Sequence, residues 1–323
     1  NNAGYQVTIS QGTGANVVIP NGGIKMVVTD GAGAGAAVTD VLDMTGGTDN
    51  VGLGSGSLGT AITTGIDNVA IGQGAGAALT SGGNNTTGQY NVGVGASVFE
   101  ANTTGTNNVA VGMRALDANT TGDQNVSIGG ASLGANTTAS NNVAVGYLAL
   151  TTNTTGASNT ALGDQSLEAN TTGASNTAVG KDSLDANTTG SNNTAIGQDA
   201  LGAATTADSN TAVGVSALKL NETGTSNVAV GKDALRANLA NNNTAVGMDA
   251  LTANTTGHSN TAMGKNAGIA LTTGDKNIAI GSDALESQTT ADNNTAVGTS
   301  ALNANTTGDE SVAIGMEAAK VNT

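Results

Sequence analysis

The sequence predicts an all-β protein built as a parallel β-solenoid, a chain wound into many short coils that stack on one another. Two observations predict this fold class. A five-residue motif recurs sixteen times, mostly at one fixed spacing, and Gly, Asn and Thr occur too often for helices. The 323 residues include 49 Gly but only one Phe, three Tyr and no Trp. The core must therefore be thin and filled by Val, Ile, Leu and Ala.

The repeated motif consists of Asn, a β-branched residue, a tiny residue, an aliphatic residue and Gly, as in residues 108–112. The first two intervals between closing glycines are 18 and 23 residues, and the later ones are 17, with a single interval of 16. In that short interval, residues 238–241 (Asn-Leu-Ala-Asn) replace the usual Asn-Thr-Thr-Gly turn. The period predicts about 16 coils of about 17 residues each.

Each coil is expected to contain two short strands and two turns. In residues 176–192 the motif alternates and is β-branched, which is typical of a strand. The Ser-Leu-Asp-Ala segment that follows is predicted to be a second extended segment. Gly and Asn-Thr-Thr-Gly mark the turns. Neighbouring coils would stack at the strand spacing of about 4.8 Å.

Comparing the copies column by column indicates which residues face inward. The residue before the motif Gly is aliphatic in all sixteen copies, and the residue two positions earlier is Val, Ile or Thr. These two residues share one face of a strand, so we expect them in the coil interior. A Leu four residues after the Gly, present in twelve copies, would close this core.

The tiny residue between them would then face outward. It is Ala in thirteen copies, Gly in two and Ser in one, which predicts close contact with another backbone. We expect this column to form the interface of a homotrimer. The predicted trimer-interface residues are Ala110, Ala144, Ala161, Ala178, Ala195, Ala212, Ala229, Ala245, Ala262, Ala279, Ala296 and Ala313.

Asn opens the motif in fifteen of the sixteen copies, with Ser311 the exception. Stacked Asn side chains can form a hydrogen-bonded ladder, and Asn also tolerates turn geometry. Charged residues such as Lys181, Asp182 and Glu168 lie outside the motif and predict a solvated outer surface.

The motif, as at residues 277–281 (Asn-Ile-Ala-Ile-Gly), resembles the head repeats of YadA-type trimeric autotransporter adhesins. The resemblance spans about residues 50–323 and implies a left-handed parallel β-roll in trimers, with the small residue at the subunit interface. The 17-residue unit is longer than the adhesin unit and is more similar to repeats in tail-fibre proteins of aquatic phages.

Residues 1–49 differ from the repeats and predict a small β-rich module that caps the solenoid or connects it to a preceding part. Segments 5–9, 16–19 and 24–28 are strand candidates separated by Gly-containing turns, and residues 45–49 are linker-like. Residues 50–323 form the β-roll repeat domain. Residue 1 is Asn rather than Met, as expected of a processed product or an internal fragment.

Several classes of chemistry are not expected. The chain has no Cys and one His, His258, predicted to be an exposed turn residue, so we expect no catalytic site, no metal site and no cofactor. The net charge is −15 with nine Lys and Arg, which excludes a nucleic-acid partner. No apolar run is long enough to insert into a membrane.

The Asn-Thr-Thr segments are formal N-glycosylation sequons, although the interpretation that the sequence favours is that Asn-Thr-Thr-Gly simply makes the turn between coils. The candidate glycosylation sites are Asn102, Asn119, Asn136, Asn153, Asn170, Asn187, Asn254 and Asn305. The same turns raise the alternative of an ice-binding β-solenoid, but their two threonines are adjacent and cannot both face one plane.

We therefore expect a structural fibre and not an enzyme: the shaft of a trimeric phage tail fibre or adhesin involved in host or surface attachment. The alternatives are a bacterial trimeric autotransporter adhesin head and the ice-binding solenoid. The expected partners are other copies of the chain and, through a tip not evident here, a cell-surface glycan or receptor. The expected location is extracellular, on a virion tail fibre or a bacterial surface.

Overall fold

The computed structural model describes the backbone of four strands within residues 7–44, and then residues 50–53, 57, 67–76 and 88–320. These residues contain only strands, turns and bends, and no helix, so the all-β solenoid prediction is confirmed. The predicted linker at residues 45–49 lies outside the described residues. The chain divides into two compact units, residues 1–147 and 148–323.

Four strands precede the repeats in the first unit. They are β1 (Val7–Ile9), β2 (Val17–Ile19), β3 (Ile24–Thr29) and β4 (Val38–Met44). β1 pairs with β2 and β3 pairs with β4, both antiparallel. Three of these strands confirm the sequence prediction, and β4 was missed. The division between residues 49 and 50 stays a prediction.

The repeats place one three-residue strand in each coil, sixteen in all. The first unit contains β5 (Val51–Leu53), β6 (Val69–Ile71), β7 (Val92–Val94), β8 (Val109–Val111), β9 (Val126–Ile128) and β10 (Val143–Val145). Each pairs in parallel with the next, in register.

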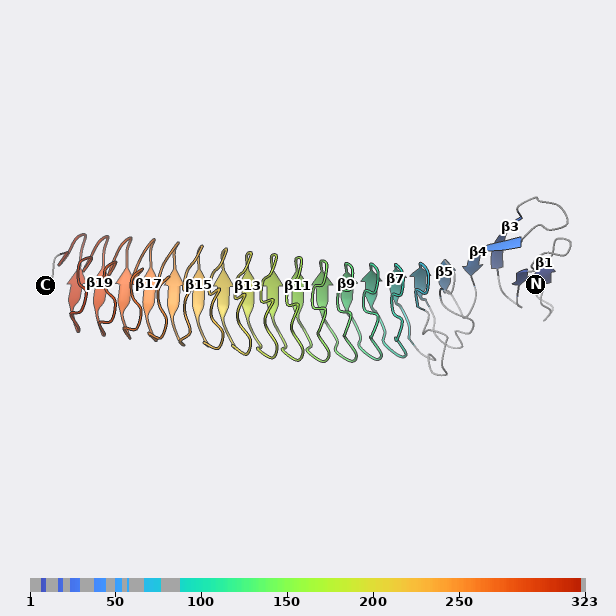
Figure 1. Ribbon diagram of the computed structural model, residues 1–323, viewed down its shortest axis with the longest axis horizontal. Helices are drawn as coiled ribbons and strands as arrows, with labels where there is room; N and C mark the ends of the chain where they lie inside the picture. The colour runs from blue at the N-terminus through green and yellow to red at the C-terminus, as the bar shows by residue number, and fades with distance from the viewer. Residues whose placement is uncertain are drawn as a thin grey trace. The chain divides into compact units, whose positions relative to one another are not determined.

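The second unit continues the pattern with ten strands. They are β11 (Thr160–Leu162), β12 (Thr177–Val179), β13 (Thr194–Ile196), β14 (Thr211–Val213), β15 (Val228–Val230), β16 (Thr244–Val246), β17 (Thr261–Met263), β18 (Ile278–Ile280), β19 (Thr295–Val297) and β20 (Val312–Ile314). Pairing is parallel and in register throughout. Within each unit the strands lie side by side in sequence order (Figure 1).

The prediction of a second strand in each coil is wrong. The segment after the motif Gly is a run of turns, in which residues such as Asp182 and Leu184 adopt left-handed backbone angles of 54° and 51°. Positive φ angles of this size are unfavourable for residues other than glycine, because the Cβ atom comes too close to the backbone. They are held here because Leu184 is fully buried and its N–H donates to the carbonyl of Ala200 in the next coil at 3.0 Å.

The strand centre faces the coil interior, opposite the buried Leu column. In the one coil where Phe99 replaces Leu, the strand centre is Gly93 instead of Ala. A Cβ atom at residue 93 would lie 3.0 Å from the ring of Phe99 and 3.1 Å from Val98. The larger side chain is therefore matched by a smaller one across the interior, which is how close-packed cores conserve volume.

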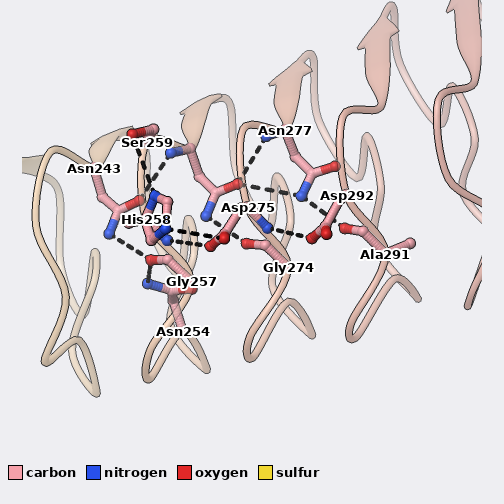
Figure 2. A network of polar contacts seen from close by, with 11 residues as sticks. Asn243, Asn254, Gly257, His258, Ser259, Gly274, Asp275, Asn277, Ala291 and Asp292 are labelled. Atoms are coloured by element: carbon pink, nitrogen blue, oxygen red, sulfur yellow. Dashed lines mark hydrogen bonds and ion pairs between the residues drawn. The ribbon is translucent and has the colours of Figure 1, made fainter.

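The opening Asn of the motif forms a buried ladder, as one of the two sequence readings proposed. In the second unit, the N–H of Asn277 donates to Oδ1 of Asn260 in the preceding coil at 2.8 Å. The Asn277 side-chain amide donates to the carbonyl of Ala291 at 2.8 Å (Figure 2). The same pair of bonds recurs along both units, for example at Asn125. Each Asn thus joins two coils and also closes its own.

The Asn of the Asn-Thr-Thr-Gly turn forms a second buried ladder. Nδ2 of Asn187 donates to Oδ1 of Asn170 at 2.8 Å and to the carbonyl of Gly190 at 3.0 Å. The ladder is interrupted where the next coil carries Ala204, and Oδ1 of Asn187 is buried without a hydrogen-bond partner. A buried acceptor without a donor costs about 1–3 kcal/mol.

We therefore predict that Ala204→Asn raises the free energy of unfolding by about 1 kcal/mol, because its amide can donate to Asn187. Denaturant unfolding followed by circular dichroism would measure the gain. Ala204→Leu is the matched control, since Leu271 occupies this column in another coil but has no donor. Equal effects of both variants would contradict the ladder as the source of the stabilisation.

Candidate functional site

The outer face of the strand ladder is an uncharged surface that continues from coil to coil in each unit. In every coil the first and third residues of the strand point away from the interior and are half-buried or exposed, while the central residue is buried. Two columns of side chains therefore run along the outside of each unit. No position in either column carries a charged residue. We call these two columns the strand face.

In the first unit the strand face is entirely aliphatic. One column is Val in all six strands, and the other contains only Leu, Ile and Val. Side chains of this face are exposed even though in-register neighbours flank them: Ile71 by 37% and Ile128 by 39%. The residues are Val51, Val69, Val92, Val109, Val126, Val143, Leu53, Ile71, Val94, Val111, Ile128 and Val145.

In the second unit one column is aliphatic and the other is mostly threonine. Leu162 is 46% exposed and Met263 is 45% exposed in the aliphatic column. The other column has Thr in seven of ten strands and Val or Ile in the remaining three, β15, β18 and β20. Parallel pairing stacks equivalent residues, such as Thr177 on Thr194, directly on one another.

The strand face is comparable in size with one side of a protein interface. Monomeric soluble proteins rarely expose apolar patches larger than a few hundred Å². Two residues from each of ten strands give twenty residues on the strand face of the second unit. A stable protein interface uses about 20–30 residues on each side. The strand face is therefore large enough, and uncharged enough, to be covered by another chain.

The predicted orientation of the side chains on each repeat strand is wrong. The structure places Ala110, Ala144, Ala161, Ala178, Ala195, Ala212, Ala229, Ala245, Ala262, Ala279, Ala296 and Ala313 inside the coils, with at most 5% of each residue exposed. A partner chain has no access to them. The aliphatic residues on either side, expected inside, are on the outside. The coil is too narrow for three bulky columns, because the buried Leu and two Asn ladders already fill it.

The candidate glycosylation sites are also interior residues. Asn102, Asn119, Asn136, Asn153, Asn170, Asn187, Asn254 and Asn305 are at most 2% exposed. Each amide nitrogen donates to a carbonyl of its own turn, and several also donate along the second ladder, as when Asn254 donates to Asn238 at 2.7 Å. A glycan on this nitrogen would require the side chain to leave the interior. The alternative reading, a structural turn, agrees with the geometry.

Charged side chains lie on the turns around the strand face and none of those described is buried. Partial burial raises the pKa of Asp185, and the neighbouring Asp182 raises that pKa further. Burial likewise raises the pKa of Asp117. The hydrogen bond to Asp182 raises the pKa of the exposed Lys181. Partial burial is therefore the main cause of the shift at the two aspartates, and a hydrogen bond to a carboxylate is the main cause at the lysine.

The described residues contain no group of three or more His, Asp or Glu side chains placed to bind a metal ion. His258 is half-exposed on a turn, as predicted, and its Nε2 lies 3.0 Å from Asp275. Among these residues no helix is long and apolar enough to cross a membrane.

The sequence contains one signal for the true direction of the strand face. The exchange of Ala for Gly at residue 93, together with Leu for Phe at residue 99, indicates contact across the interior. Searches for related proteins add nothing to the assignment, because no protein-family model, curated protein or solved structure matches the chain.

Proposed function

We propose that this protein is a structural fibre, the shaft of an extracellular tail fibre or adhesin, which assembles as a homotrimer through the strand face. The observation that carries the proposal is the uncharged, largely aliphatic strand face that repeats coil after coil. The function would be to hold an attachment element at a distance from its base. It requires no cofactor and no catalytic residue.

Other copies of the same chain are favoured over unrelated partners as the molecules that cover the strand face, because this face repeats at one spacing. A second copy of the same chain presents the same spacing, so parallel copies can match coil for coil. Closed cyclic symmetry then buries the face of every copy. The chain has a net charge of −15 and no charged residue on the strand face, so like charges outside this face oppose further lateral association.

The similarity of the 17-residue repeat to tail-fibre repeats of aquatic phages favours a phage tail fibre, with a bacterial adhesin head as the alternative. An ice-binding solenoid is the second candidate, and one observation favours it. Thr160, Thr177, Thr194 and Thr211 stack in register on the outer surface of four successive strands. Thermal hysteresis in cooled solution would support this alternative. Its absence, together with a trimeric mass, would support the fibre.

We predict that Val179→Glu with Val213→Glu abolishes assembly, because two carboxylates would be buried against a partner without a counter-charge. Light scattering should give three times the 30.9 kDa chain mass for the unchanged protein and one chain mass for the variant. Thr172→Glu, on an exposed turn away from the strand face, is the control and should remain trimeric.

Circular dichroism would establish that the double variant keeps its β structure, since both side chains point out of the coil. A monomeric mass for the unchanged protein would overturn the proposal. A double variant that stays trimeric would overturn the placement of the interface on the strand face.

A further inference from the structure

The one short coil leaves a hollow in the row of turns of the second unit. Leu239 N–H donates to the Thr255 carbonyl at 2.8 Å, as the first threonine of a regular turn does with its counterpart in the next coil. The carbonyl of Ala240 accepts from the side-chain amides of Asn227 and Asn238, as the turn glycine does elsewhere. The residue missing from this coil is therefore the second, exposed threonine.

That threonine is present in the coils on either side, as Thr223 and Thr256, both exposed. Its loss opens a hollow of about 450 Å³ on the surface. Small-molecule sites in proteins commonly occupy about 300–1,000 Å³. The lining residues are Leu239, Ala240, Asn241, Asn242, Thr256 and His258.

The lining combines one apolar patch with neutral hydrogen-bonding groups. Leu239 stands where most coils have threonine and is 45% exposed. Beside it lie two amides, a hydroxyl and an imidazole. Neither lysine, arginine nor a carboxylate lines the hollow.

Two of the polar groups are held in place by neighbouring coils. Oδ1 of Asn241 accepts from the N–H of Thr225 at 2.7 Å and from its hydroxyl at 3.3 Å. The backbone N–H of His258 donates to Oδ1 of Asp275 at 2.8 Å, and Nε2 of His258 lies 3.0 Å from Oδ2 (Figure 2). Binding groups fixed before the ligand arrives lose less entropy when it binds.

We propose that this hollow binds a neutral saccharide unit. A sugar offers hydroxyl groups that can donate to and accept from amides, Thr256 and the imidazole, and its C–H face can cover Leu239. An anionic ligand would find no lysine or arginine in the lining and would approach a chain of net charge −15. The inference rests on the proposed attachment function and gives the shaft itself a contact with surface glycans.

The test uses His258 as its reporter, because it is the only histidine of the chain and gives a single set of imidazole C–H signals in nuclear magnetic resonance. The full chain is titrated at fixed pH with lactose, maltotriose and N,N′-diacetylchitobiose in turn. We expect at least one of these to shift the His258 signal in a saturable way, with a Kd in the millimolar range.

Inserting a threonine between Leu239 and Ala240 restores the 17-residue coil and fills the hollow, while His258 remains as the reporter. This variant should lose the shift, with affinity reduced at least tenfold. Leu239→Thr keeps the length of the turn, removes the apolar patch and should weaken binding severalfold. An unchanged circular dichroism spectrum would show that both variants are folded.

The proposal is overturned if none of the three saccharides shifts the signal, or if the insertion variant binds as tightly as the unchanged protein. The mass of each sample is measured by light scattering in parallel. A trimeric protein that binds no saccharide would contradict only the saccharide site. A monomeric protein that binds a saccharide would contradict only the proposed trimer.

Discussion

Replacing Ala178 with glutamine is expected to lower the free energy of unfolding by about 3 kcal/mol or more. Ala178 is fully buried at the centre of β12, stacked between Ala161 and Ala195. Four additional heavy atoms would overpack the interior, at a cost of about 1–3 kcal/mol. The amide would find no free partner there, which costs about 1–3 kcal/mol more.

The measurement is denaturant unfolding followed by circular dichroism at low protein concentration. Thr172→Gln introduces the same side chain on an exposed turn of the same unit and should change stability by less than about 0.5 kcal/mol. If Ala178→Gln were as stable as this control and failed only to assemble, the alanine column would face a partner chain after all.

Replacing Gly180 with alanine should have a comparable effect for a different reason. Gly180 has a φ of 130°, which side-chain-bearing residues rarely adopt. A Cβ atom there would lie 2.7 Å from the backbone carbonyl carbon and oxygen of Gly197 in the next coil. Because two backbones meet at this point, neither can move aside without breaking the stack. We expect a loss of about 3 kcal/mol.

Gly173→Ala is the matched control, since it makes the same change in the same unit. Gly173 is also crowded, by the carbonyl of Gly190 and Oδ1 of Asn170, but its backbone angle is an ordinary one. Ala139, Ala207 and Ala291 occupy this column in other coils, so the turn can adjust to a methyl group. A Gly173→Ala variant as damaging as Gly180→Ala would show that crowding, and not the φ angle, decides the cost.

The length of the coil, the presence of a parallel strand in each motif and the structural role of Asn could all be predicted from the sequence. Each of these follows from a repeated local pattern. A glycine that recurs every 17 residues reports a backbone position that no side chain can occupy, and Gly180 shows why. The short coil at residues 238–241 was likewise visible as a single interval of 16.

The direction of the strand face was decided only by the tertiary structure. Alternation along a three-residue strand separates its residues into two sets, but it does not say which set faces inward. That choice depends on the width of the coil. The left-handed turn that carries Leu184 brings this side chain close to the strand, and the residue opposite it is Ala178, a small side chain as in every other coil.

Two features could not be predicted from the sequence for the same reason: the hollow beside His258, and the run of turns found where a second strand was expected. Both depend on how turn residues of successive coils lie against one another, which no single repeat reveals. The repeated motif by itself determined that this chain is a solenoid of parallel coils. Packing within the coil decided that the aliphatic residues of the strand face outward, because the interior already holds one Leu column and two Asn ladders and leaves room opposite them only for a small side chain such as Ala, Gly or Ser.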